Sequence, residues 1–151
     1  MVTTIMSSSK IVAMIPARIG STRLKMKNLA LIAGKPMIAY AIESAKASGV
    51  FNKVVLNSDS PIFEKIAEEY GCEFYLRPEF LGGSSIKSDD VVSDFIVQYG
   101  GDIVVWVNPI SPLQTAQDIK EVVSYFQRNN FDSLITVKNE QVHCVLDESP
   151  I

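Results

Sequence analysis

The feature that most constrains the fold is a regular alternation of short apolar runs with longer stretches of helical spacing. The apolar runs predict strands at Ile11–Ile15, Lys53–Asn57, Glu73–Leu76, Ile103–Val107 and Ser133–Val137. The helical stretches are Met37–Ser48, Ile62–Tyr70, Asp89–Tyr99 and Thr115 to about Gln127. Strands separated by helices pair in parallel, because each helix returns the chain across the sheet. The pattern therefore predicts an α/β fold: a doubly wound, mainly parallel sheet with helices on both faces.

Capping residues mark the ends of the predicted helices. Pro36 suits the first position of a helix, and Gly49 suits the position just after its end. Ser88 can cap the third helix, whereas Asp59 is expected to cap the second rather than to bind a metal. The residues Thr115-Ala116-Gln117-Asp118 have the form of a capping box, which predicts the start of the last helix.

A basic segment follows the first predicted strand. It combines a flexible Gly20-Ser21 pair with four cations, and no acid precedes Glu43. The cations are Arg18, Arg23, Lys25 and Lys27. Glycine lets backbone N–H groups approach an anion, and fixed cations offset its charge. We favour a polyphosphate site over a merely solvated basic loop, although Lys25 is expected to be solvated.

The charge distribution supports a local anion site. The chain of 151 residues has a net charge of −3, which argues against general nucleic-acid binding. All 17 acidic residues follow residue 42, so the beginning of the chain is basic and the remainder acidic. The partner expected from this asymmetry is a small anion, with neither nucleic acid nor a membrane as partner.

The length and the cysteines predict one intracellular domain. Residues 10–140 are expected to form a nucleotide-binding α/β domain after a flexible extension at 1–9, and residues 141–151 to begin another segment. Cys72 and Cys144 are far apart, which favours reduced thiols in a cytoplasmic protein. The first residues lack the pattern of a secretion signal, and no apolar run is long enough to span a membrane.

Ligands of open α/β sheets bind beyond the carboxyl ends of the strands. This rule selects the segment after the first strand, the Arg77–Ser88 loop and the Asn108–Gln114 loop, which we expect to meet in one cleft. The glycines match neither a dinucleotide fingerprint nor an ordinary P-loop. Trp106, in the fourth predicted strand, is expected in the core.

Several motifs together resemble the acylneuraminate cytidylyltransferases, which make CMP-sialic acid and related CMP-nonulosonates. The resemblance implies a Rossmann-like nucleotidyltransferase fold and covers nearly the whole chain. Its motifs are Ile15-Pro16-Ala17-Arg18-x-Gly20-Ser21-x-Arg23-Leu24-x-x-Lys27-Asn28, Gly34-Lys35-Pro36-Met37-Ile38-Ala39-Tyr40, Leu76-Arg77-Pro78-Glu79-x-Leu81 and Asn108-Pro109-x-Ser111-Pro112-Leu113. The first motif also occurs in cytidylyltransferases that activate 3-deoxy-manno-octulosonate.

The resemblance implies roles for matching residues. Arg18 and Lys27 are the implied catalytic residues and, with Ser21, hold the CTP phosphates, while Asn28 lies near the ribose or the reacting phosphate. Arg77 and Ser88 recognise cytosine. The implied nucleotide-binding set is Ala17, Arg18, Ser21, Lys27, Asn28, Arg77 and Ser88, and the implied substrate-binding residues are Asn108 and Ser111.

The implied reaction is attack of a sugar hydroxyl on the α-phosphorus of CTP, with Mg²⁺ as cofactor, a sialic-like acid as the second substrate and a homodimer as the full-length assembly. The resemblance places the main Mg²⁺ ligands and the dimer contacts beyond residue 151. Two residues depart from the family pattern: Gly83-Ser84 replaces Thr-Asp, and Asn108 replaces Gln. The alternatives are a weakly active nucleotide-binding module and a 3-deoxy-manno-octulosonate cytidylyltransferase.

Overall fold

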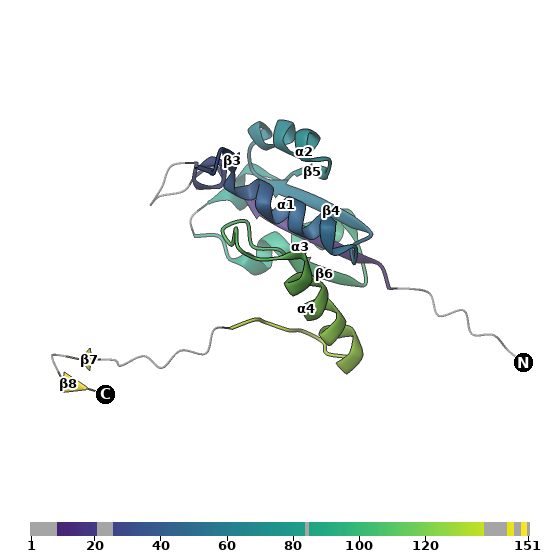
Figure 1. The fold of residues 1–151 in the computed structure, drawn as a ribbon. Helices are drawn as coiled ribbons and strands as arrows, with labels where there is room; N and C mark the ends of the chain where they lie inside the picture. Colours follow the sequence, from purple (N-terminus) through teal and green to yellow (C-terminus); the bar gives the residue numbers. More distant parts are fainter. Residues whose placement is uncertain (1–8, 21–25, 84, 138–144, 147–148, 151) are drawn as a thin grey trace, which may run out of the picture.

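The computed structural model describes residues 9–20, 26–83, 85–137, 145–146 and 149–150. Its centre is a four-stranded parallel sheet in the order β5-β4-β1-β6 (Figure 1). The strands are β1 (Ile11–Ala17), β4 (Lys53–Ser58), β5 (Glu73–Leu76) and β6 (Ile103–Trp106). Since β1 lies between β4 and β6, the chain moves outward in both directions from β1. This order creates a topological switch point between β1 and β6.

Helices cover both faces of the sheet, as the sequence predicts. Alternate residues of β1 point to opposite faces: Ala13 and Ile15 belong to one buried cluster, and Val12 and Met14 to another. The first cluster packs against α1 (Met37–Ser48), α2 (Glu64–Tyr70) and α4 (Ala116–Asn129), and the second packs against α3 (Ser88–Tyr99). The predicted doubly wound α/β fold is therefore confirmed.

The short elements complete the described chain. Three 3₁₀ turns are η1 (Lys27–Leu29), η2 (Pro61–Phe63) and η3 (Glu79–Gly82). Two short antiparallel pairs are formed by β2 (Leu31–Ile32) with β3 (Lys35–Pro36), and by β7 (Val145–Leu146) with β8 (Ser149–Pro150). No helix within the described ranges is long and apolar enough to cross a membrane.

Several predicted helix ends are confirmed and others are wrong by one position. Gly49 ends α1 with a positive φ of 68°, and Thr115 and Asp118 form the predicted capping box of α4. Pro36 precedes α1 instead of starting it. Ser88 is the first residue of α3 and not its cap, because Lys87 already occupies the N-cap position with extended backbone angles.

The predicted strand at residues 133–137 does not form. An apolar segment becomes a strand only where another strand offers it backbone hydrogen bonds. Here a groove of about 680 Å³ separates residues 132–136 from β6, whose described pairing is with β1 alone. The side chains of Ile135 and Val137 are consequently left exposed.

Candidate functional site

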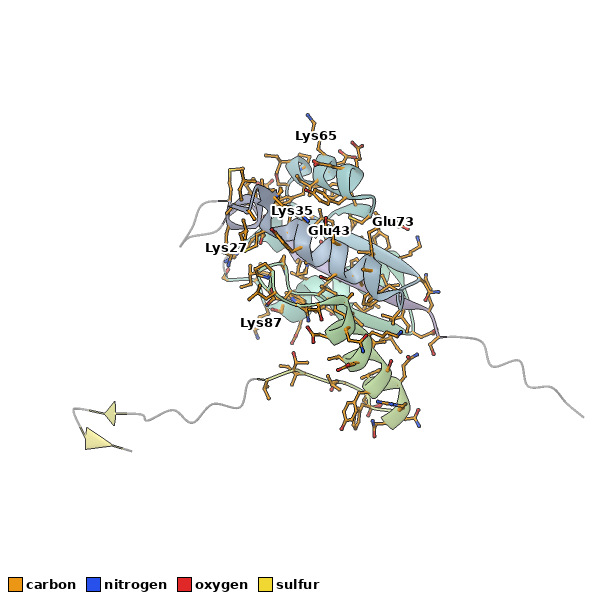
Figure 2. The ribbon with its side chains drawn as sticks, viewed as in Figure 1. Lys27, Lys35, Glu43, Lys65, Glu73 and Lys87 are labelled. Carbon is orange, nitrogen blue, oxygen red and sulfur yellow. The ribbon has the colours of Figure 1, made fainter. Side chains whose placement is uncertain are left out.

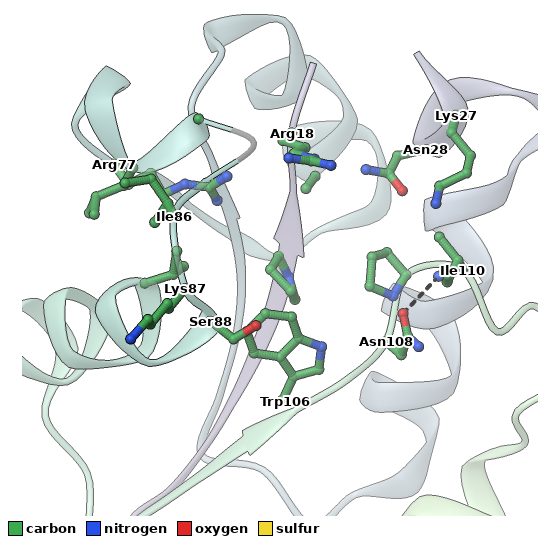
Figure 3. Close-up of a pocket in the computed structure, with 16 residues that line it drawn as sticks. Arg18, Lys27, Asn28, Arg77, Ile86, Lys87, Ser88, Trp106, Asn108 and Ile110 are labelled. Atoms are coloured by element: carbon green, nitrogen blue, oxygen red, sulfur yellow. Dashed lines mark hydrogen bonds between the residues drawn. The ribbon is translucent and has the colours of Figure 1, made fainter. Parts of the chain in front are cut away.

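A pocket of about 350 Å³ opens at the carboxyl ends of the parallel strands, beside the switch point between β1 and β6 (Figure 3). It brings together most of the residues that the sequence selects for the site. These are Ala17, Arg18, Lys27, Asn28, Arg77, Ser88 and Asn108. Ser111 lies outside this pocket, in the groove beside β6, and Ser21 falls outside the described residues. The three predicted loops therefore do converge on one cleft.

The lining of the pocket is cationic. Arg18, Lys27, Arg77 and Lys87 contribute four positive charges, and no Asp or Glu is among its described lining residues. Figure 2 shows Lys27 and Lys87 at the same end of the sheet, opposite the end where Glu73 lies. Because the whole chain is net negative, this local excess favours an anionic ligand over a neutral one.

Two of these cations have no bonding partner among the described residues. Arg18 directly follows β1, and Lys27 begins η1; both side chains are half-buried. Among the described residues, neither side chain has a hydrogen-bond or ion-pair partner. By contrast Lys35, which also belongs to a motif of the family, pairs with Glu43 at 2.6 Å outside the pocket (Figure 2). The pKa of Lys35 is raised, mainly by its hydrogen bond to Glu43.

Asn28 offers the pocket an unused acceptor. Its side chain is only 5% exposed, and its Oδ1 atom has no described hydrogen-bond partner. A buried polar atom without a partner costs free energy, so its persistence beside a cavity suggests that a ligand supplies the missing donor. Asn28 lies next to Lys27 on η1, across the pocket from Arg77 (Figure 3).

Arg77 is the most buried cation of the pocket. Its side chain is 5% exposed, and its Nη1 atom donates to the backbone oxygen of Asn57 at 2.8 Å and to Asn57 Oδ1 at 3.1 Å. Its Nε atom is buried without a described partner. Burial lowers the pKa of Arg77, although a guanidinium keeps its charge at any ordinary pH. Glu79, two residues further along the chain, forms no described ion pair with Arg77.

Two pocket residues differ from the sequence expectations. Trp106 is 43% exposed and lines the pocket, so the prediction that it is a core residue is wrong. It ends β6, where the strand emerges from beneath the helices. Asn108 is partly engaged by its own loop, because its Oδ1 accepts from the Ile110 N–H at 3.3 Å (Figure 3). Its amide nitrogen remains available to a ligand.

Sequence reasoning missed the contribution of the β4 end. Asn57 holds Arg77, and Asp59 Oδ1 accepts a hydrogen bond from the Ile19 N–H at 3.1 Å. Asp59 is therefore not the predicted helix cap; Ser60 occupies that position. Gly82 packs so closely on Asp59 that a Cβ there would lie 2.1 Å from Oδ2. The sequence could have placed both residues near the ligand edge, since polar residues at the carboxyl end of a parallel strand fall there, but it could not give their partners.

The chain is similar in sequence to proteins of known activity. A sequence profile described as "Cytidylyltransferase" matches residues 12–149. The N-acylneuraminate cytidylyltransferase of Escherichia coli O18:K1:H7 is 38% identical over 120 residues, which cover 79% of this chain and 29% of that protein. The pseudaminic acid cytidylyltransferase of Campylobacter jejuni serotype O:2 is 32% identical over 130 residues, covering 80% of this chain and 54% of that protein. The chain thus spans between about a third and about half of these relatives.

A solved structure of a CMP synthetase resembles this chain in its fold. CMP:2-keto-3-deoxy-manno-octonic acid synthetase, in a structure described as complexed with CTP, superposes with a TM-score of 0.72 at 25% identity. The match covers 81% of this chain and 49% of that one. A 4-diphosphocytidyl-2C-methyl-D-erythritol synthase from Anaerococcus prevotii superposes at 0.64 with 13% identity, a likeness of fold alone.

Proposed function

The chain belongs to the cytidylyltransferase family, and we propose that its pocket binds CTP and directs CMP to the hydroxyl of a nonulosonic acid. The observation that carries the proposal is one cavity lined by four cations and no described acid, at the switch point of the sheet. A nucleoside triphosphate is the kind of ligand whose charge such a lining would offset. The relatives are named cytidylyltransferases, which favours CTP as the nucleotide.

In the proposed reaction, the hydroxyl oxygen of the sugar acid forms a bond to the α-phosphorus of CTP. The bond from that phosphorus to its bridging oxygen breaks, and pyrophosphate leaves. The protein contributes alignment of the two reactants and stabilisation of negative charge. Arg18 and Lys27 are proposed to hold the phosphates, because their charged groups are free among the described residues.

The other side of the pocket is proposed to hold the base and the sugars. Arg77 and Ser88 are assigned to cytosine, and Asn28, with its unused Oδ1 acceptor, to a hydroxyl of the ribose. Asn108, which lines the pocket, is assigned to the acceptor sugar. Ser111 lies in the neighbouring groove, so a sugar contact there would require the ligand to extend past Asn108.

The organisation of the chain belongs to the same proposal. Residues 10–140 would bind the nucleotide, and the segment from 141 would begin the part concerned with the sugar and with a homodimer. Among the described residues, no three His, Cys, Asp or Glu side chains are grouped so as to hold a metal ion. No described residue is therefore assigned to Mg²⁺, and no proposed step is routed through the ion. The cytoplasmic location stays a prediction.

The test is a titration of the chain with CTP by calorimetry, followed by an assay of pyrophosphate release with CTP, a nonulosonic acid and Mg²⁺. Binding and release together support the transferase. Binding without release supports the alternative of a nucleotide-binding module. Absence of CTP binding contradicts both.

A further inference from the structure

We propose that Asn57 is a positioning residue for nucleotide selection: it holds the Arg77 guanidinium in the one orientation that can read a pyrimidine base. This inference rests on the proposed function, since it takes the ligand of the pocket to be a cytidine nucleotide. Asn57 does not line the pocket and is 0% exposed, so it would act only through Arg77.

Burying the side-chain amide of Asn57 inside the sheet costs free energy. β4 reads Lys-Val-Val-Leu-Asn-Ser, and Asn57 lies on the same face as Val55, toward α3. A buried amide is destabilising unless its hydrogen bonds are made. Among the described residues, the Nδ2 atom of Asn57 donates only to the sulfur of Met14, at 3.4 Å, and thioether sulfur is a weak acceptor. An aliphatic residue would suit this strand position better, so the amide needs a reason beyond packing.

Both the side chain and the main chain of Arg77 are hydrogen-bonded to β4. Asn57 presents two oxygens, from its backbone and its side chain, to the same Nη1 atom of Arg77. The backbone of Arg77 is fixed as well, because its N–H donates to Ser58 O at 2.8 Å. Main chain and side chain are thus both tied to the last two residues of β4. A side chain that is fixed before a ligand binds loses less conformational freedom on binding.

The hydrogen bonds to Asn57 do not neutralise the charge of Arg77. The described ion pairs are Lys35–Glu43 and Lys53–Glu73, so no described carboxylate lies within ion-pair distance of Arg77, although the more distant Asp59 and Asp94 favour its charged form. Asn57 satisfies one nitrogen with neutral oxygens and leaves the positive charge for a ligand. The buried Nε atom still lacks a described partner. An aspartate at position 57 would bond to the same nitrogen and also pair with the charge.

The consequence is selection by donor and acceptor pattern. A guanidinium only donates hydrogen bonds. Cytosine presents two adjacent acceptors, O2 and N3, whereas uracil presents O2 beside an N3–H donor. An arginine held at a fixed angle therefore favours cytosine, and a freely rotating arginine does so less. Figure 3 shows Arg77 across the pocket from Lys27 and Asn28, which leaves the phosphate side to other cations.

The test compares three ligands by calorimetry: CTP, UTP and inorganic tripolyphosphate, which has phosphates but no base. In Asn57→Leu, which removes the side-chain acceptor at similar volume, we expect about tenfold weaker CTP binding, corresponding to loss of one ordinary interaction of about 1.4 kcal/mol. The preference for CTP over UTP should fall with it, and tripolyphosphate binding should be unchanged. Asn57→Asp keeps the acceptor and should keep the preference.

A matched control is provided by Asn52, which lies just before the start of β4. Asn52 Oδ1 accepts from the Ile11 N–H at 2.7 Å, far from the pocket, so Asn52→Leu also removes one structural amide acceptor. It should leave the binding of all three ligands unchanged. If Asn57→Leu does not melt cooperatively, Asn57→Val, which suits a strand, replaces it with the same expectation.

Either of two results would contradict the proposed role of Asn57 without contradicting the proposed function. One is an Asn57→Leu variant with the CTP affinity and the CTP preference of the unaltered chain. The other is an equal loss of CTP and tripolyphosphate binding, which would indicate general damage to the pocket. If the unaltered chain does not bind CTP, the proposed function fails first, and the inference that rests on it fails too.

Discussion

The two sides of the pocket hold their cations in opposite ways. Arg77 is 5% exposed and tied to β4 by bonds from its main chain and its side chain. Arg18 and Lys27 are half-buried on the segments that follow β1, without described partners. A tied cation has fixed geometry and can distinguish one ligand from another. A loosely held cation supplies charge at many angles, which suits a flexible polyphosphate.

Cations of equal charge in this pocket therefore need not have equal functions. All four cations of the pocket contribute to its potential, and that potential attracts any anion. Discrimination requires a donor whose position is determined before the ligand arrives. The sheet determines it for Arg77, whereas Arg18 and Lys27 have no described partner that would do so.

The largest effect is expected on the loosely held side. Lys27→Ala removes a charge proposed to contact the phosphates, so pyrophosphate release should fall on the order of 10²–10³-fold. Binding of CTP and of tripolyphosphate should weaken together. Lys65→Ala is the control, because Lys65 is exposed on α2 away from the pocket (Figure 2). Turnover of Lys27→Ala at the rate of the unaltered chain would remove Lys27 from the site.

The next effect is expected on the tied side. Arg77→Lys keeps the charge but cannot reproduce the planar arrangement of donors. Loss of a hydrogen bond from a charged group costs about 1.5–3 kcal/mol, so CTP affinity should fall at least about tenfold. Tripolyphosphate should bind as before. If calorimetry instead gives equal losses for both ligands, the division of the pocket into two sides is wrong.

A smaller effect is expected from an element outside both sides. The Thr115 hydroxyl accepts from the Asp118 N–H at 3.1 Å, and Asp118 Oδ2 accepts from the Thr115 N–H at 2.8 Å. Thr115→Ala should lower the free energy of unfolding by about 1 kcal/mol in urea titrations. CTP binding should not change. A parallel loss of CTP affinity would mean that pocket binding follows overall stability and not the local geometry of either side.

The smallest expected effect is a dependence on alkaline pH. Tyr75, two residues before Arg77, donates to Asp94 Oδ2 at 2.9 Å, and burial together with Asp94 raises the pKa of Tyr75 from 10.0 to about 12. The folded chain thus favours the neutral phenol. This contribution to stability is complete below pH 10 and is lost as the pH rises toward about 12. Melting curves of the unaltered chain should show this decline, and Tyr75→Phe should reduce it.

Much of the fold could be predicted because its signals are local. The apolar runs of β1, β4, β5 and β6 and the turn at Gly49 need only neighbouring residues to be recognised. The strand predicted at 133–137 failed for a reason that no local pattern contains: a strand requires a partner edge within hydrogen-bond reach, and a groove separates this segment from β6.

The candidate site divides in the same way. Its loops could be located from the sequence because the carboxyl ends of parallel strands share one edge of the sheet. The roles of Asn57 and Asp59 could not, since each depends on contact with a residue that is distant in the chain. Trp106 read as a core residue from its apolar surroundings, and only its place at the strand end exposes it.

By itself the sequence determined the order of strands and helices and the concentration of positive charge near the end of β1, because periodicity and composition act over a few residues. Tertiary structure decided which cations became rigid. Parallel pairing places Asn57 directly opposite Tyr75, two residues before Arg77, and so brings two oxygens of β4 to one guanidinium. That contact exists only once the sheet has formed, since pairing in register fixes which distant side chains meet.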